Sequence, residues 1–279
     1  MKKIILTFFG LLIIGTVIFV SCEKNESQTT DLSALKLDMI NKYKVVGEDH
    51  NRNLSLILQD IKEKKNTIST KEDFINVFNS SLIEVITNSN ISNQYNISQS
   101  EILELANSNF QSQFNHGKSN LSDSQLNSLS EEFRDILDRL IAISNNKELT
   151  ITKEQKLIDY LDDEAVIKLT DEKELNVYFG ASSVAKYSFE YWTNNIDQWL
   201  VLIKEINLNS NKINPNSNKT EKVQYEMLDG VVGADVGGAV AGALTAAITG
   251  PVGWVAGGII GSSATSSGKF ATNVWNYFF

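Results

Sequence analysis

The sequence predicts an all-α protein, with a bundle-like helical body followed by a Gly/Ala-rich helical hairpin. Three observations favour this fold class. Apolar residues recur at three- and four-residue steps over most of residues 32–206, which places them on one face of each helix. Four of these periodic segments begin near a Ser or Thr that stands three residues before a Glu or Gln, the pattern of a capping box. Proline occurs only at positions 215 and 251, so it interrupts no helix of the body.

Composition limits the classes of function. The chain has 279 residues, of which 42% are hydrophobic and 21% charged, values typical of globular protein. Its formal net charge is −9, and arginine occurs only at positions 52, 134 and 139. An acidic, arginine-poor chain lacks the basic surface that nucleic-acid binding requires. The same charge opposes attraction to anionic lipid headgroups.

Residues 1–21 have the organisation of a secretory signal. Lys2 and Lys3 precede an apolar run of 17 residues, Ile4 to Val20, and a small residue then precedes Cys22. Removal of this segment takes the net charge from −9 to −11. An uncleaved transmembrane anchor is the alternative, for which 17 apolar residues are barely enough.

The residues Phe-Val-Ser-Cys at 19–22 resemble the lipobox of bacterial lipoproteins, with Phe19 where the motif usually has leucine. The resemblance covers about the first 22 residues, and it implies that Cys22 is diacylated and becomes the mature N-terminus. The partner would then be membrane lipid, and the location the bacterial cell envelope, at the outer membrane or cell surface rather than the inner membrane. Cys22 is the only cysteine, so the mature chain forms no internal disulfide.

A polar tether, residues 22–31, leads into the all-helical domain, residues 32–206. We expect helices over 32–46, 54–61, 74–86, 102–114, 126–143, 157–165 and 184–206, with a break near Gly47. The expected capping boxes are Ser69 with Glu72, Ser98 with Glu101, Ser122 with Gln125 and Thr152 with Gln155. In the last helix Tyr191, Trp192 and Trp199 could line a ligand groove, but aromatic residues at helical spacing favour a core.

Residues 207–228 begin with an Asn-rich stretch and are expected to form a linker. Beyond it, residues 229–279 contain two apolar arms, 236–249 and 252–267, on either side of Gly250-Pro251. Pro suits the first turn of a new helix, so a helical hairpin is expected. The glycines expected to pack its helices are Gly233, Gly237, Gly238, Gly242, Gly253, Gly257 and Gly261.

Four-residue spacing of these glycines carves a groove in which two backbones can approach closely. The segment resembles the glycine zippers of membrane proteins, two-peptide bacteriocins and bacterial envelope proteins, which implies close helix packing. Arms of about 21 and 24 Å are shorter than the roughly 30 Å hydrocarbon core. Two arrangements remain open: the hairpin lies in lipid or against other copies, or it docks on the body as intramolecular core. In lipid, the outward side chains would be Val240, Leu244, Ile248, Val255, Ile259 and Ile260, and the interfacial aromatics Trp254, Trp275, Tyr277 and Phe279.

The sequence offers no catalytic constellation, metal site or cofactor motif. His50 stands beside Glu48 and Asp49 without a second ligand at metal spacing, so we interpret it as part of a solvated helix end, and His116 as part of a turn. The run Asp162, Asp163 and Glu164 is interpreted as a charged face. An uncharacterised hydrolase is the minor alternative to a non-enzymatic protein.

These patterns together predict a non-enzymatic envelope lipoprotein whose hairpin engages membrane or self-associates, with bacteriocin-like action as one form. The alternative is a structural or partner-binding lipoprotein whose hairpin packs as intramolecular core.

Overall fold

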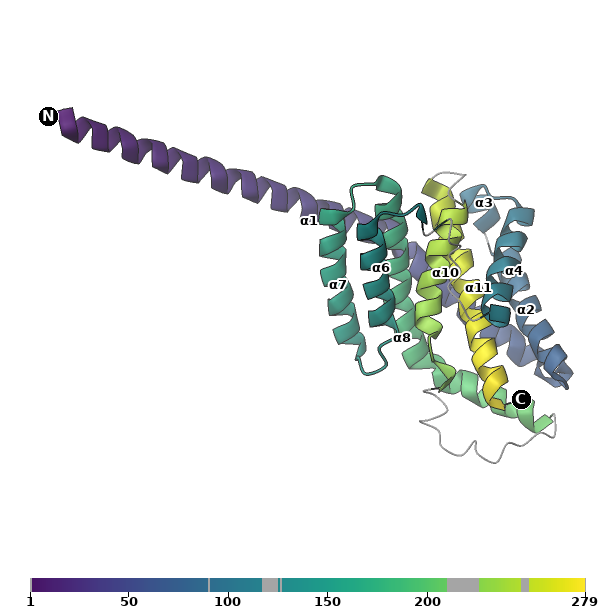
Figure 1. Ribbon diagram of the computed structural model, residues 1–279. Helices are drawn as coiled ribbons and strands as arrows, with labels where there is room; N and C mark the ends of the chain where they lie inside the picture. Colours follow the sequence, from purple (N-terminus) through teal and green to yellow (C-terminus); the bar gives the residue numbers. More distant parts are fainter. Residues whose placement is uncertain are drawn as a thin grey trace.

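The computed structural model confirms the all-α, bundle-like fold class, since its described residues form helices and contain no strand (Figure 1). Side chains are described for residues 31–112, 125, 127–206, 226–246 and 252–277, apart from positions 71, 90 and 92. Several expectations lie outside the described residues: the signal segment, Cys22, the tether before Asp31, most of the Asn-rich linker, and Ser122, Ile248, Gly250 and Phe279. His116 was expected in a turn, but it is the last residue of the helix Gln99–His116.

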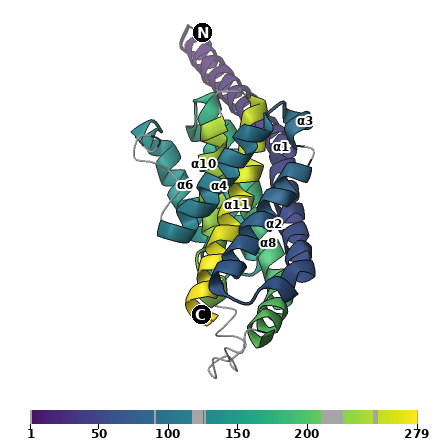
Figure 2. The same cartoon turned by 90° about the vertical axis from the view of Figure 1, so that its right-hand side faces the viewer.

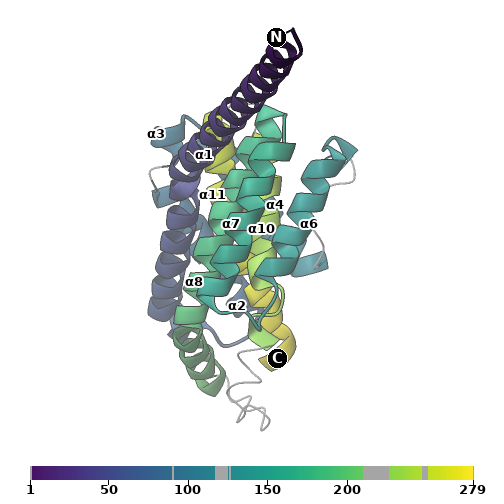
Figure 3. The same ribbon diagram turned by 90° about the vertical axis from the view of Figure 1, so that its left-hand side faces the viewer.

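The hairpin consists of α10 (Val231–Ala246) and α11 (Pro251–Phe278), and it lies in the middle of the body. On one side it packs against α2 (Lys71–Asn88), α3 (Ile91–Tyr95) and α4 (Gln99–His116), which Figure 2 shows in front of it. On the other side lie α6 (Glu131–Ser144), α7 (Ile151–Lys168) and α8 (Glu172–Asn209), as Figure 3 shows. The helix α1 (Lys2–Lys64), followed by the short η1 (Lys65–Thr67), packs along α8, α11 and α2.

The structure therefore places the hairpin within the helical body, the second of the two arrangements considered from the sequence. The five described residues expected to face lipid are all buried: Val240, Leu244, Val255, Ile259 and Ile260. The second arm is also longer than expected, because α11 continues through Phe278 rather than ending near Ser267. Its extra turns carry Phe270 and Val274 into the core.

An aromatic cluster joins the hairpin to the surrounding helices. Phe270 of α11 stacks on Trp192 of α8, with ring centroids 4.9 Å apart, and meets Trp199 edge-on at 5.0 Å. Phe78 of α2 stacks on Trp199 at 5.8 Å. Tyr191, Trp192 and Trp199 are all buried, which confirms the core interpretation of the aromatic helix. Such pairs contribute about 0.5–1.5 kcal/mol each beyond burial of their area.

Helix starts follow the expected chemistry, but two begin at neighbouring residues. Ser98 and Glu101 form the expected reciprocal pair, with the Glu101 N–H donating to Ser98 Oγ at 3.3 Å and the Ser98 N–H donating to the Glu101 carboxylate at 3.0 Å. The cap of α2 is Thr70 with Asp73 rather than Ser69 with Glu72. The cap of α7 is Thr150 rather than Thr152. In both cases the cap is a threonine, one of the residues that accept a hydrogen bond from an orphan N–H at a helix start.

Two further expectations about element boundaries are wrong. The helix expected over 126–143 begins at Glu131, because the Ser130 side chain caps it by accepting from the Phe133 N–H at 3.1 Å. α1 passes through Gly47 without a break. A Cβ at Gly47 would lie 2.7 Å from the Ser183 carbonyl oxygen, so this glycine lets α8 cross close to α1 instead of ending a helix.

Within the described residues, we find no helix that combines the length and hydropathy needed to cross a membrane.

Candidate functional site

The closest helix contact in the hairpin is built from glycines. A Cβ at Gly257 would lie 2.6 Å from the carbonyl carbon of Gly242, and a Cβ at Gly242 would lie 2.8 Å from that of Gly257. Gly238 and Gly261 form the next step, where a Cβ at Gly238 would lie 2.6 Å from the Gly261 carbonyl oxygen. No side chain fits in these places, so α10 and α11 touch backbone to backbone.

The other three predicted glycines have different surroundings. Gly233 lies under Asn145, whose Oδ1 accepts from the Gly233 N–H at 3.1 Å. A Cβ at Gly237 would have no atom within 4 Å. Gly253 is buried in the first turn of α11. The seven glycines thus divide into four at the α10–α11 contact and three elsewhere.

The aromatics that were expected at a membrane interface lie along α11. Trp254, Trp275 and Tyr277 are each partly buried, and Trp254 and Tyr277 pack against the core. The Nε1 of Trp254 is buried without a hydrogen-bond acceptor.

A buried polar cluster joins the hairpin to the body, and its central residue is Asp235 of α10. Asp235 is fully buried, and its Oδ2 accepts hydrogen bonds from the Ser188 hydroxyl and, at 3.3 Å, from Trp192 Nε1–H. His50 Nε2 lies 3.4 Å from the same oxygen, which is within ion-pair distance but outside hydrogen-bond geometry. Helices α1 and α8 therefore provide all three groups that face the hairpin's carboxylate.

His50 is not at a solvated helix end, contrary to our expectation. It is fully buried, and its Nδ1 lies 3.1 Å from Ser262 Oγ of α11. Either the Ser262 hydroxyl donates to Nδ1, or a proton on Nδ1 is donated to Ser262 Oγ, depending on the tautomer of the ring. In each case His50 connects both helices of the hairpin to α1.

The order Ser262, His50, Asp235 matches the nucleophile, base and orienting acid of a hydrolase. All three side chains are 0% exposed, so no substrate reaches the serine hydroxyl. The single hydrogen of the Ser262 hydroxyl can instead be donated to the Ile259 carbonyl within its own helix, at 3.1 Å. This arrangement can hold helices together, but it offers no place for a reacting group.

A second buried polar cluster joins α7 to α8. Asp162 accepts from Tyr178 at 3.0 Å, Ser182 at 2.7 Å and Lys186 at 2.8 Å. Burial and the Asp162 carboxylate raise the pKa of Tyr178 well above its ordinary value. Asp162 is therefore buried and paired, which corrects its assignment to a charged face, whereas Asp163 is exposed.

Glu154 lies in the first turn of α7 and is fully buried, with no partner for either carboxylate oxygen. Burial raises its pKa to about 8, although the positive charge of Lys186 partly opposes this shift. Glu154 is thus mostly protonated at neutral pH.

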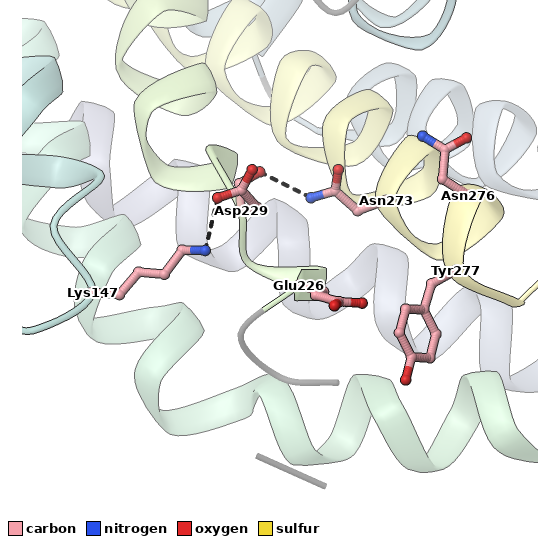
Figure 4. Close-up of a pocket in the computed structure, with 6 residues that line it drawn as sticks. All are labelled: Lys147, Glu226, Asp229, Asn273, Asn276 and Tyr277. Carbon is pink, nitrogen blue, oxygen red and sulfur yellow. Dashed lines mark hydrogen bonds and ion pairs between the residues drawn. The ribbon is translucent and has the colours of Figure 1, made fainter. Parts of the chain in front are cut away.

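A surface pocket of about 260 Å³ opens where the two ends of the hairpin meet the α6–α7 loop (Figure 4). Lys147 pairs with Asp229 at 2.8 Å, and Asn273 Nδ2 donates to the carbonyls of Met227 and Asp229 at 2.9 and 3.0 Å. These contacts tie the start of α10 to the end of α11. Among the described residues no group of three His, Cys, Asp or Glu side chains could hold a metal ion.

Sequence reasoning missed the His50–Asp235 cluster. Its signal was present, since Asp235 is the one charged residue of α10, but His50 and Ser188 stand 185 and 47 positions away along the chain. No protein-family model matches the chain, and no curated protein or solved structure matches it either.

Proposed function

We propose that the chain is a non-enzymatic lipoprotein of the bacterial cell envelope, in which Cys22 carries the lipid and the helical body is a scaffold that binds another protein. The hairpin is the intramolecular core of this scaffold. One observation favours this arrangement over a hairpin in lipid: the α10–α11 glycine contact and the side chains that could have faced lipid are buried in the helical body.

The lipid attachment is supported by the sequence alone. Lys2 and Lys3, the apolar run and Cys22 as the single cysteine follow the order of a lipoprotein signal. A diacylated cysteine anchors stably, because each buried methylene contributes about 0.8 kcal/mol. We place the body at the outer membrane or cell surface.

Two measurements test this proposal. Cys22→Ala should abolish labelling by a fatty-acid analogue and release the chain from the membrane fraction, and labelling that persists would contradict the anchor. Removal of residues 229–279 should abolish cooperative thermal unfolding of the body, followed by circular dichroism. An unchanged melting curve would show that the hairpin is dispensable to the core.

A second candidate is membrane engagement or self-association by the hairpin, with bacteriocin-like action. It is favoured by one observation, the absence of any charged residue between Asp235 and Lys269. The hairpin would have to leave the body first, which exposes Phe270 and Trp192 to water. Leakage of dye-filled vesicles caused by the full chain, and lost on removal of residues 229–279, would favour this candidate over the scaffold.

A further inference from the structure

Exposed apolar side chains recur on two helices of the body, α1 and α7. Among the described residues, eight large apolar side chains are exposed, and five of them lie in two stretches of helices that contact each other: Leu35 and Leu37 on α1, and Leu157, Tyr160 and Ile167 on α7. The other three, Leu56, Val201 and Val252, lie on three different helices. We call Leu157, Tyr160 and Ile167 the α7 face. Tyr160 is 71% and Ile167 64% exposed, which is unusual for side chains of this size when they recur on one helix.

The α7 face lies beside the point where the chain enters the body. Lys36 Nζ of α1 contacts the Asp159 carbonyl at 3.0 Å and Asp163 Oδ1 at 2.6 Å. These two residues flank Tyr160 in the middle of the face. Figures 1 and 3 show α7 on the outside of the body, next to α1.

The α7 face is less acidic than the chain as a whole, whose net charge is −9. Each acidic side chain that is exposed or partly exposed there has a cation: Asp159 pairs with Lys186, Asp163 with Lys36, and Glu164 with Arg139 and Lys168. Lys153 and Lys156 are exposed. Among the described residues neither of these two lysines has an ion-pair partner, and both stand within four positions of Leu157. The face thus combines three exposed apolar side chains with two lysines that have no ion-pair partner in the described part of the chain and with acidic side chains that are paired.

We propose that the α7 face rests on the surface of the lipid bilayer that holds the Cys22 anchor. This inference depends on the lipid attachment proposed above. The nine residue steps from Cys22 to Asp31 reach about 30 Å at most when fully extended, so the anchor keeps the start of the body close to the bilayer. A helix with an apolar outer face, a tyrosine and flanking lysines lies in the plane of the interface. Lysine stems extend their ammonium groups toward the headgroup phosphates while the apolar side chains enter the acyl boundary.

The single cysteine makes this contact measurable. In the acylated chain Cys22 has no free thiol, so Ile167→Cys introduces the only site for a thiol-reactive fluorophore. Val201→Cys is the matched control, because Val201 is also β-branched, lies on a long helix and is 56% exposed, against 64% for Ile167. Both full-length acylated variants are reconstituted into vesicles of phosphatidylcholine and phosphatidylethanolamine that contain a lipid-borne nitroxide quencher.

We expect the nitroxide lipid to reduce fluorescence at position 167 and to leave position 201 unchanged. Equal fluorescence loss at both positions in a chain that floats with the vesicles would overturn the docking while retaining the anchor. Protection at position 167 from aqueous iodide without quenching by the nitroxide lipid would also overturn it, since another copy of the chain would then cover the face. If Cys22 is not acylated, the unsubstituted chain takes up the fluorophore at Cys22, which removes the lipid anchor and the docking together, whether or not the chain floats with the vesicles.

Discussion

The substitution Gly257→Ala measures the backbone contact between α10 and α11 directly. The new Cβ would lie 2.6 Å from the carbonyl carbon of Gly242 and 2.8 Å from the Ala246 Cβ. Carbon atoms pack at about 3.5–4.0 Å, so the two helices must separate by roughly 1 Å. The atom in the way belongs to the backbone of a buried helix, and it has no rotamer by which to move aside.

Gly237→Ala is the matched control on the same hairpin. Its Cβ would meet no atom within 4 Å. Both substitutions replace a helical glycine, and both gain up to about 1 kcal/mol of helix propensity. The difference between them isolates the steric contact, which for overpacked cores amounts to about 1–3 kcal/mol.

The assay is urea unfolding of the mature chain in a Cys22→Ala background, followed by far-ultraviolet circular dichroism at 25 °C. We expect Gly257→Ala to unfold at a lower urea concentration than Gly237→Ala, with the same slope. Thermal midpoints should differ in the same direction by about 2–4 °C per kcal/mol. Identical midpoints would show that α10 and α11 are not in backbone contact, and the location of the hairpin in the core would lose its main support.

Three further outcomes follow from the buried groups. Phe270→Ala should lower the free energy of unfolding, measured in urea, by about 3–5 kcal/mol, because the Phe270 ring packs against Trp192 and Trp199. A loss no larger than that of Val201→Ala, at an exposed position, would contradict this prediction. Asp235→Ala should also lower the free energy of unfolding by about 3–5 kcal/mol, because it removes one partner of a buried polar cluster. Asp235→Asn keeps an acceptor oxygen and should destabilise the protein less. Equal stability of the two variants would refute the role of the hydrogen bonds. Glu154 has a folded pKa of about 8 against an ordinary 4.5, so between these pH values the folded chain binds more protons there than the unfolded chain, and this group lowers stability as pH rises. Glu154→Gln should therefore gain stability over the parent chain at pH 8 but not at pH 4.5, and thermal midpoints that differ equally at both would contradict the shift.

The helices of the body could be predicted from sequence where one side of the helix faces water. On α6, Phe133, Ile136 and Leu140 recur at helical spacing because the residues between them are exposed, apart from Leu137 on the same buried side. The start of α8 was missed by about twelve residues for the opposite reason. Positions 174–185 are buried without exception, and a helix that is buried all round has no amphipathic period.

The location of the hairpin could not be predicted, because its composition suits both arrangements. Glycine and alanine allow close packing in lipid and in a protein core alike. The hydroxyls of α11 do not distinguish the lipid arrangement from the core arrangement either. Thr265 and Ser267 donate to carbonyls one turn earlier in their own helix, at 2.8 and 2.9 Å. A hydroxyl satisfied in this way needs no partner from another helix, whatever surrounds it.

Asp235 is the residue that separates the two arrangements. Its carboxylate belongs to the hairpin, but its donors Ser188 and Trp192 belong to α8, and His50 belongs to α1. A hairpin that moved into lipid would leave these groups behind and carry the carboxylate into a medium where a charge costs about 2.5–3.5 kcal/mol or more. Within the body the same carboxylate is held at the junction of three helices. Asp235, the one charged residue of α10, therefore links the hairpin to α1 and α8. These contacts favour the body over lipid as the location of the hairpin.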